Sequence, residues 1–234
     1  STRSAAYAAA VERLLAQGDA FECTCSRAEI LAAAEGPATP GEELRYPGWC
    51  RSGVRAAQRD RAIRFLTPPG EVVFDDLLQG HVAVDVSREV GDFVIRRRDG
   101  LFAYQLAVVV DDAEQGITHV VRGVDLLNSS PRQILLQRRL RLATPMYAHM
   151  PLAIGPDGVK LSKSAGAAKL DLRRPAEALW RALRFLRQNP PPALRYASPA
   201  GLWDWAVEHW TSVPLQGMRA AGLDGDNDSR IVRS

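Results

Sequence analysis

Lysine is confined to one short segment of this 234-residue chain. The 30 basic residues include only three lysines, at positions 160, 163 and 169. The segment Lys160-Leu161-Ser162-Lys163-Ser164 follows a Gly- and Pro-containing turn at residues 155–158. A compact ammonium on a flexible stem suits a loop that closes over phosphate, whereas arginine's rigid fork suits fixed, bidentate partners. The segment therefore predicts a phosphate site, and a solvated turn is the alternative.

The cysteines form a second candidate site. Cys23 and Cys25 are separated by one residue, and Cys50 follows Tyr46 by four positions. Three thiolates leave a tetrahedral zinc ion one ligand short. The residues alone leave that fourth place open to a water, Glu22 or His81. Inert buried thiols are the alternative, because free cysteine is often a core residue. So few cysteines exclude a disulfide framework and indicate a reduced compartment.

Arg122 is a candidate for recognising a carboxylate. It follows the apolar run at residues 117–121, which predicts a buried parallel strand. Ligands gather at the carboxyl ends of strands in open α/β sheets, and an arginine there suits bidentate carboxylate binding. Tyr104 lies upstream in the segment 102–112. The alternatives are that Tyr104 is a core aromatic residue and that Arg122 forms a surface ion pair.

Strands and helices alternate around these residues. We expect a first helix over 4–17 that ends at Gly18, and a short helix with a Ser26–Glu29 capping box. Strand-like patterns follow between residues 62 and 86 and over 93–97. The clearest helix has Ser130 as N-cap and Gln133 closing a capping box. Further helices are predicted from Pro175 and over 202–210. This order indicates an α/β core with a helical C-terminal third.

The composition is ordinary for a globular protein, with 46% hydrophobic and 24% charged residues. No apolar run is long enough to cross a bilayer, so we expect a cytoplasmic protein without a membrane partner. The net charge of +3 permits a nucleic-acid partner without indicating one. Four arginines on or near one helix are candidates for phosphate contacts, although a solvated charged face is the default interpretation: Arg132, Arg138, Arg139 and Arg141.

The lysine segment resembles the KMSKS signature of class I aminoacyl-tRNA synthetases, in its KLSKS form. The resemblance implies that the five residues 160–164 bind ATP and that Lys163 is catalytic, because it neutralises the departing pyrophosphate. Residues 102–112 and 117–127 resemble the second half of the Rossmann-type domain in the glutamyl- and glutaminyl-type enzymes. This implies that Tyr104 shapes the amino-acid pocket and Arg122 faces a glutamate carboxylate; Asp125 is a further candidate for a ligand hydroxyl.

The cysteine pattern resembles the C-x-C…Y-x3-C zinc site of the glutamyl-queuosine tRNA(Asp) synthetases. The resemblance implies a closed, structural Zn²⁺ site of four ligands: Cys23, Cys25, Tyr46 and Cys50. Tyrosine normally ionises near pH ~10, so it binds only if the cation lowers its pKa strongly. The chain after Ser164 is also too short for the anticodon-binding domain of a full glutamyl-tRNA synthetase.

Members of this short family activate glutamate with ATP and Mg²⁺ and transfer it to queuosine in the anticodon of tRNA(Asp). The resemblance implies these substrates and a tRNA-modifying ligase activity, and we expect a monomer. Two alternatives are a truncated catalytic fragment of glutamyl-tRNA synthetase and a non-catalytic, zinc-stabilised RNA-binding module.

One part of the class I pattern is missing from these residues. None of the four histidines lies in a HIGH-type setting, which this class uses to hold ATP near its first strand. We therefore expect an N-terminally incomplete enzyme that cannot form glutamyl-adenylate by itself.

The expected fold is α/β: a partial Rossmann-type class I synthetase catalytic domain with a zinc-bearing insertion and a helical C-terminal region. The expected segments are 1–20, a helix of the truncated first Rossmann half, and 21–95, the insertion with the zinc site and a small sheet. The segment 96–150 is the second Rossmann half with the amino-acid pocket, and 151–234 holds the KLSKS loop and C-terminal helices.

Overall fold

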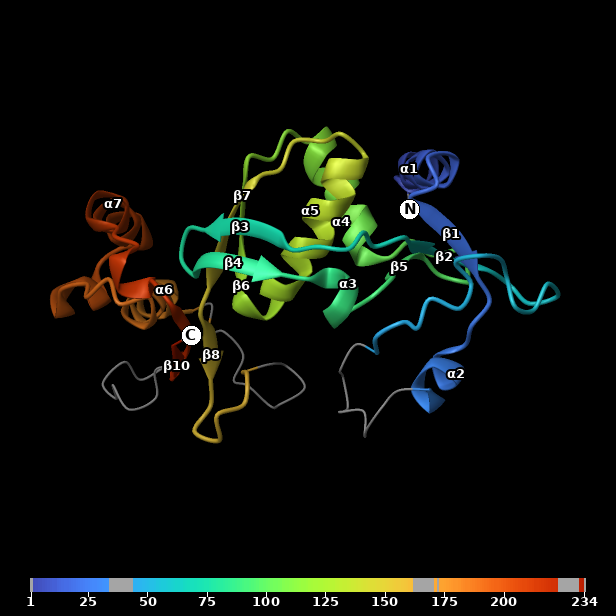
Figure 1. Cartoon of the computed structure of the whole chain (residues 1–234). Helices are drawn as coiled ribbons and strands as arrows, with labels where there is room; N and C mark the ends of the chain where they lie inside the picture. Colours follow the sequence, from blue (N-terminus) through green and yellow to red (C-terminus); the bar gives the residue numbers. More distant parts are fainter. Residues whose placement is uncertain (1, 34–43, 162–170, 172, 223–231, 234) are drawn as a thin grey trace. The chain divides into compact units, whose positions relative to one another are not determined.

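A computed structural model of the chain describes residues 2–33, 44–161, 171, 173–222 and 232–233 (Figure 1). Its contacts divide the chain into two compact units. The first unit contains Ser1–Phe74, Val82–His119 and Asn128–Met146. The second contains Asp75–His81, Val120–Leu127 and Tyr147–Ser234. Each unit therefore gathers segments that are far apart in the sequence, and each is described by itself.

The first unit contains a three-stranded sheet, and helices come before, between and after its strands in the sequence. The sheet has the order β1 (Ala20–Cys23), β2 (Ala62–Phe65) and β5 (Val94–Arg96), and each neighbouring pair is antiparallel. The register pairs Ala20 with Phe65 and Cys23 with Ala62. All four residues of β2 are buried, and Phe65 packs against Phe93 with ring centroids 5.2 Å apart. The helices of this unit are α1 (Ser4–Ala16), α2 (Arg27–Ala32), α3 (Val86–Glu89), α4 (Tyr104–Glu114) and α5 (Ser130–Arg139).

A four-stranded sheet has the order β4 (Gly80–Val84), β3 (Val72–Asp76), β7 (Met146–Met150) and β6 (His119–Gly123). The unit boundary passes through all four of these strands. Strands β3 and β7 run parallel and pair Asp76 with Tyr147. This pairing places the end of β3 beside β7, where the second unit's polar site begins.

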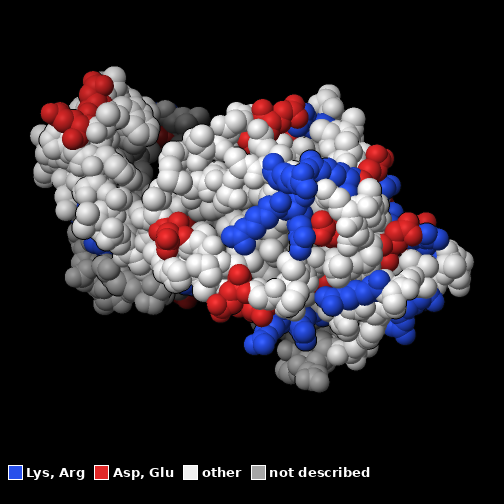
Figure 2. All heavy atoms as spheres, turned by 45° about the horizontal axis from the view of Figure 1, so that its top comes forward, with Lys and Arg blue, Asp and Glu red and all other residues white. Residues whose placement is uncertain are grey.

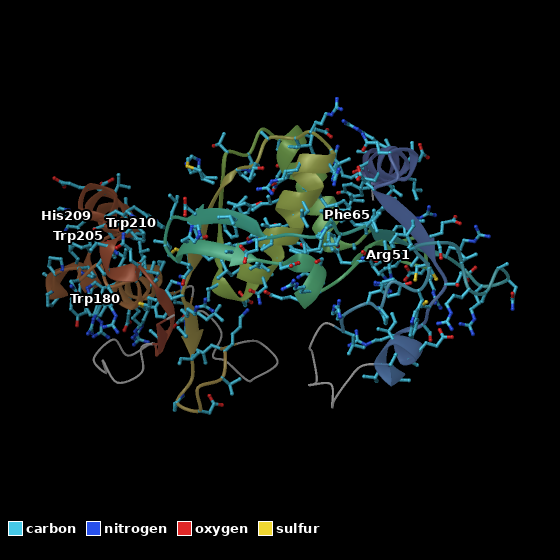
Figure 3. The ribbon with its side chains drawn as sticks, viewed as in Figure 1. Arg51, Phe65, Trp180, Trp205, His209 and Trp210 are labelled. Atoms are coloured by element: carbon cyan, nitrogen blue, oxygen red, sulfur yellow. The ribbon has the colours of Figure 1, made fainter. Side chains whose placement is uncertain are left out.

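The second unit continues with a small sheet and the C-terminal helices. Strands β10 (Val232–Arg233), β9 (Met218–Gly222) and β8 (Leu152–Ile154) lie in that order, with β8 and β9 parallel. The helices are α6 (Pro175–Phe185) and α7 (Pro199–His209), together with the 3-10 turns η3 (Pro192–Tyr196) and η4 (Val213–Leu215). The core of α6 and α7 includes Leu183, Leu202 and Ala206. Figure 3 labels Trp205 and His209 on α7, whose rings stack 4.8 Å apart.

Two helix boundaries follow the local sequence as expected. Helix α1 ends before Gly18, whose φ of 74° is in the left-handed region that favours glycine. Helix α2 begins with the predicted capping box: the Glu29 N–H donates to Ser26 Oγ (3.1 Å), and the Ser26 N–H donates to Glu29 Oε2 (2.6 Å). The chain therefore enters α2 with its first free N–H groups satisfied.

The predicted cap at Ser130 is wrong. A 3-10 helix, η1 (Val124–Ser129), runs directly into α5, so the first turn of α5 is preceded by helical backbone. Ser129 occupies the cap position without a side-chain cap hydrogen bond, and the Gln133 amide donates instead to Gln105 Oε1 (2.9 Å). A helix that continues from another helix does not need the side-chain cap that the sequence pattern suggests.

The buried strand predicted over 117–121 is also wrong in position and burial. The strand is β6, two residues later, and it lies at the edge of its sheet with Val121 64% exposed. A short apolar run does not distinguish a central strand from an edge strand. Among the described residues, no helix is long and apolar enough to cross a membrane.

Candidate active site and metal centre

The three cysteines of the first unit converge on one point. Their sulfur atoms all lie within 4.8 Å of one another, and the Cys25 and Cys50 sulfurs are 3.5 Å apart. The Tyr46 hydroxyl oxygen is 3.5 Å from the Cys23 sulfur and 3.7 Å from the Cys25 sulfur. All four side chains are buried. Strand β1 supplies Cys23, and the loops that follow β1 and precede β2 supply the other three residues.

These separations fit a tetrahedral zinc ion. Bonds of about 2.3 Å to sulfur and about 2.0 Å to oxygen give S–S separations of about 3.8 Å and S–O separations of about 3.5 Å. The alternatives for the fourth ligand are engaged elsewhere: Glu22 forms an ion pair with Arg61, and His81 Nδ1 lies 3.0 Å from Asp75. Of the three side chains Glu22, His81 and Tyr46, Tyr46 is the one whose oxygen lies at the S–O separations expected for a fourth ligand.

The backbone holds Tyr46 in this position. Its hydroxyl oxygen accepts a hydrogen bond from the Cys50 N–H (2.8 Å), and its own N–H donates to the Val90 carbonyl (3.3 Å). Gly91 passes so close that a Cβ atom there would lie 2.9 Å from the Tyr46 carbonyl oxygen, and its φ is 73°. A side chain at position 91 would therefore displace the backbone of Tyr46.

The pKa values of three of these groups are shifted, and not all in the same direction. Burial raises the pKa of the Cys25 thiol to about 11 and also raises the pKa of the Tyr46 hydroxyl. Burial acts in the same direction on Cys50, but hydrogen bonds with the Thr24 backbone and the Tyr46 hydroxyl outweigh it and lower that pKa to about 6. A bound Zn²⁺ stabilises the anionic forms of all four groups. The donor set therefore fits a metal ion.

A buried arginine lies against this centre. Arg64, which is only 9% exposed, donates from Nε to the Cys23 sulfur (3.3 Å), and its guanidinium carbon lies 4.0 Å from the centre of the Tyr46 ring. Its Nη1 donates to the Asp92 carbonyl oxygen (2.8 Å). The Asp92 carboxylate in turn forms two bonds with Arg51, which Figure 3 labels (2.7 and 2.8 Å). The Arg64 guanidinium thus lies beside side chains that would hold the metal ion.

The second unit contains the arginine predicted to bind a carboxylate. Arg122 lies on β6, and its Nε donates to His149 Nε2 (3.0 Å). Its Nη2 reaches the Leu126 carbonyl oxygen (3.4 Å), and its guanidinium carbon lies 5.5 Å from the centre of the Tyr147 ring. The orientation of the guanidinium plane is therefore fixed by two polar contacts and one aromatic face.

His149 is itself held by Asp76. The His149 Nδ1 and the Asp76 Oδ2 lie 2.6 Å apart, and both side chains are 0% exposed. The other carboxylate oxygen, Oδ1, accepts hydrogen bonds from three backbone N–H groups, those of Leu78 (3.0 Å), Gln79 (2.9 Å) and His149 (3.1 Å). Burial opposes ionisation of Asp76, but the hydrogen bonds from His149 and from these N–H groups keep its pKa below the ordinary value.

The lysine segment is linked to the same part of the chain. Lys160 Nζ forms an ion pair with Asp125 Oδ2 (2.5 Å), and Asp125 is three residues after Arg122. Lys160 also bridges to Ile154 by an isolated antiparallel pairing. Asp125, predicted to reach a ligand hydroxyl, thus contacts the first lysine of the segment in this structure.

Comparisons with known proteins identify the family of this chain. Residues 1–183 match the family model described as tRNA synthetases class I (E and Q), catalytic domain. The chain is 53% identical over 220 residues to the glutamyl-Q tRNA(Asp) synthetase of Dechloromonas aromatica, covering 93% of this chain and 73% of that protein. It is 52% identical over 212 residues to the enzyme of the same name from Geobacter sulfurreducens, covering 88% and 68%. The chain belongs to the glutamyl-Q tRNA(Asp) synthetase family of class I ligases.

Solved structures give the same fold. The glutamate-tRNA synthetase of Elizabethkingia anophelis matches with a TM-score of 0.58 and 25% identity. The match covers 70% of this chain but 36% of that one, so this member of the family spans just over a third of the solved synthetase. The α/β class I catalytic fold is therefore confirmed.

Several predicted site residues of this family member have a defined place. Tyr104 is the first residue of α4 in the first unit and is 50% exposed, so the structure excludes the alternative of a core aromatic residue. The structure describes two residues of the KLSKS segment, Lys160 and Leu161. The Leu161 N–H donates to the Ala153 carbonyl oxygen (2.9 Å). The rest of the KLSKS segment, Ser162, Lys163 and Ser164, lies outside the described residues.

The predicted basic helix face is only partly present. Arg132 is 6% exposed, so it cannot contact phosphate from the surface of α5; its Nη2 reaches Ser129 Oγ (3.4 Å). Arg138, Arg139 and Arg141 are exposed, and Arg139 pairs with Asp19 (3.4 Å). Basic and acidic side chains both occur on the face drawn in Figure 2. Of the four arginines, the three exposed ones therefore remain the candidates for a phosphate contact.

Sequence reasoning missed Asp76 and His149. They are 73 positions apart in the chain, and no motif spacing connects them. A weak signal existed: each lies at or next to the end of a strand, as Arg122 does. The parallel pairing of β3 with β7, which brings them together, is not visible in either local pattern.

Proposed function

We propose that the enzyme expressed from the native gene activates glutamate with ATP and transfers it to queuosine in the anticodon of tRNA(Asp), and that residues 1–234 do not form glutamyl-adenylate by themselves. The observation that carries the proposal is the fixed Arg122 guanidinium, which shares the second unit with the Lys160–Asp125 pair. Amino-acid activation needs a group for the substrate carboxylate and a group for the ATP phosphates, and in this proposal Arg122 and Lys160 take these two roles. The names of the 53% and 52% identical relatives support this choice of tRNA.

The reaction has two steps. In the first, a glutamate carboxylate oxygen attacks the α-phosphorus of ATP, an O–P bond forms, and pyrophosphate leaves. Arg122 binds an acidic group of glutamate, and Lys163 with Mg²⁺ neutralises the departing pyrophosphate. In the second, a hydroxyl of the queuosine cyclopentene ring attacks the carbonyl carbon of the mixed anhydride and AMP leaves. Orientation of the reactants supplies much of the rate enhancement.

Lys160 binds ATP phosphate in this proposal. Its ammonium is half exposed and forms one carboxylate contact, with Asp125 at 2.5 Å. An exposed ion pair contributes about 0–1 kcal/mol, so exchange of the carboxylate for a triphosphate costs little. Asp125 then becomes available to a ligand hydroxyl.

The zinc site has a structural role in this proposal. Cys23, Cys25, Tyr46 and Cys50 would supply all four ligands of a tetrahedral ion, which would leave no open position for substrate. Bound zinc holds the loop that precedes β2 against β1.

Transfer of labelled glutamate tests the proposed function. The protein expressed from its native gene is incubated with ATP and either queuosine-containing tRNA(Asp), the same tRNA without queuosine, or tRNA(Glu). We expect label only on queuosine-containing tRNA(Asp), bound to the base. Acceptor-end charging of tRNA(Glu) would instead support a catalytic fragment of glutamyl-tRNA synthetase, and RNA binding without transfer would support a non-catalytic module.

The lysine segment has a matched control within itself. Lys163→Ala is expected to reduce glutamate-dependent ATP–pyrophosphate exchange by about 100-fold or more, a loss typical for a group that stabilises transition-state charge. Lys169→Ala, outside the KLSKS residues, is expected to have little effect. Equal activity of the two variants would contradict the assignment of Lys163. Exchange measured on the 234-residue chain alone tests the separate prediction that these residues do not form glutamyl-adenylate by themselves.

A further inference from the structure

We propose that Asp76 and His149 are positioning residues that orient the Arg122 guanidinium for the substrate carboxylate. The inference deepens the proposed function and rests on it, because it assigns the groups that prepare Arg122 for glutamate. It starts from a chain of hydrogen bonds within the second unit that runs from Asp76 through His149 to Arg122.

The hydrogen bonds from Arg122 through His149 to Asp76 are consistent with only one placement of the protons. The Arg122 Nε always carries a hydrogen, so at 3.0 Å it must donate to His149 Nε2, which is then an acceptor. A histidine whose Nε2 accepts carries its proton on Nδ1, and that proton points at the Asp76 carboxylate 2.6 Å away. Neutral His149 is therefore held as the Nδ1–H tautomer, with its lone pair facing the arginine.

Asp76 is locked in turn by the backbone. Its Oδ1 accepts the N–H groups of Leu78 and Gln79 in the turn after β3, and that of His149 on β7. Only Oδ2 faces the imidazole. Because the carboxylate is 0% exposed, water does not compete for these bonds. The arginine is thus connected to two backbone segments through two buried side chains.

This arrangement matters because arginine recognises a carboxylate through the geometry of its planar fork. Tyr147 supports the guanidinium by its ring face, and its ring also stacks on His149 with centroids 6.1 Å apart. Rotation of the guanidinium would break the bond to His149 and remove it from Tyr147. Pre-orientation of this kind lowers the entropy cost of binding and raises discrimination for an acidic substrate.

Asp76→Asn reverses the donor pattern with almost no change in shape. The three backbone N–H groups at Oδ1 require that the amide oxygen stays there, so the NH₂ group faces His149 Nδ1. Nδ1 then becomes an acceptor, Nε2 carries the proton, and two N–H groups confront each other at Arg122. We expect the KM for glutamate to rise at least about tenfold, since small misplacements of a binding group have effects of this size. The KM for ATP is expected to stay within about twofold.

Asp75→Asn is the matched control. Asp75 is the preceding residue, its side chain is 86% exposed, and it contacts only His81 among the partners that the structure gives it. A second pair of variants does not depend on Asp76: His149→Gln keeps an oxygen near the position of Nε2, whereas His149→Phe keeps the ring shape without an acceptor. We expect the KM for glutamate to rise in His149→Phe and to rise less in His149→Gln. The two variants should have the same thermal stability.

The tautomer can be measured without any activity. The chain has four histidines, so ¹⁵N-histidine labelling and long-range ¹H–¹⁵N correlation spectra of the wild-type protein give few signals. The His149 signal is the one missing from His149→Gln. We expect the Nδ1–H pattern in the wild type and the Nε2–H pattern in Asp76→Asn.

The outcomes separate the two hypotheses. An Nε2–H tautomer in the wild type, or an unchanged glutamate KM in Asp76→Asn and His149→Phe, overturns the positioning role. So does an equal rise of the KM for glutamate and ATP, because that indicates general loss of structure. A wild-type protein that shows the Nδ1–H tautomer but transfers glutamate to no tRNA overturns the proposed function instead. If Asp76→Asn does not fold, the His149 pair decides.

Discussion

The cysteine centre of the first unit and the Arg122 network of the second unit are built in opposite ways. The four donor groups of the centre come from residues 23 to 50, and backbone contacts place them. The Arg122 network connects residues 76, 122 and 149, and strand pairing brings two of them together. The first site is a local feature of the chain, whereas the second exists only after distant strands have paired. The two sites should therefore respond differently to mutation, metal removal and pH.

The largest effect is expected from removing a sulfur of the cysteine centre. Cys25→Ala should reduce bound zinc from about one ion per chain to near zero, measured by mass spectrometry of the metal, and lower the free energy of unfolding by several kcal/mol, at least about 3. The first unit should be affected most, and chelation of the wild type should produce the same change. Zinc retained at one ion per chain in Cys25→Ala would contradict the site.

Tyr46→Phe tests the unusual fourth ligand. It removes the oxygen that lies 3.5 and 3.7 Å from two cysteine sulfurs and leaves the ring. We expect the zinc affinity to fall about 100-fold, since one ligand and its bond with the Cys50 N–H are lost together. Co²⁺ substitution should show a changed visible spectrum. An unchanged spectrum and affinity would mean that another donor completes the tetrahedron.

Arg64→Met tests the charge beside the centre. The substitution keeps an apolar stem but removes the donor to Cys23 and the cation over the Tyr46 ring. Loss of an outer contact of this kind weakens metal binding by about 10–100-fold. The matched control is Arg61→Met, which removes an exposed arginine that pairs with Glu22. Competition with a chelator measures both, and equal affinities would show that Arg64 has no part in holding the metal.

The pH dependence of unfolding should distinguish the second site. Because the pKa of Asp76 is lower in the folded protein than the ordinary 3.8, its stabilising contribution is full above that value and is lost as the pH falls below it through the folded pKa. Urea unfolding between pH 6 and 3 should therefore lose less free energy in Asp76→Asn than in the wild type. Asp75→Asn should follow the wild type. Parallel curves for all three proteins would mean that Asp76 is not held as an anion.

The smallest effect concerns the exposed Lys160–Asp125 pair. Asp125→Asn should change the free energy of unfolding by less than about 1 kcal/mol, because both side chains are exposed enough for solvent to screen them. Thermal melting in low and high salt checks this value. A larger change would show that the Lys160–Asp125 ion pair stabilises the fold around Lys160.

Much of the fold and the cysteine centre could be predicted because the signals are local. The capping box at Ser26, the stop at Gly18 and the helix from Pro175 depend on neighbouring residues and are confirmed. The zinc ligands remain a prediction, but the spacing that suggested them does bring the three sulfurs together. Resemblance supplied Tyr46, which no argument from the residues alone had selected.

The remainder could not be predicted because tertiary contacts decide it. The helical entry through η1 makes the Ser130 cap unnecessary, and packing buries Arg132, which we expected on an exposed charged face. The edge position of β6 was not encoded in its apolar residues. Asp76 and His149 belong to the same class of failure: each is unremarkable in its local sequence, and only the pairing of β3 with β7 gives them a shared role.

One oxygen atom of Asp76 has a consequence beyond ligand recognition. It is the common acceptor for the amide protons of Leu78, Gln79 and His149, on two stretches of chain that are about seventy residues apart. When that carboxylate leaves its place, all three protons lose their acceptor at the same moment. Hydrogen–deuterium exchange of the three amides should therefore give one common opening free energy, and that value would report how often the strand ends separate.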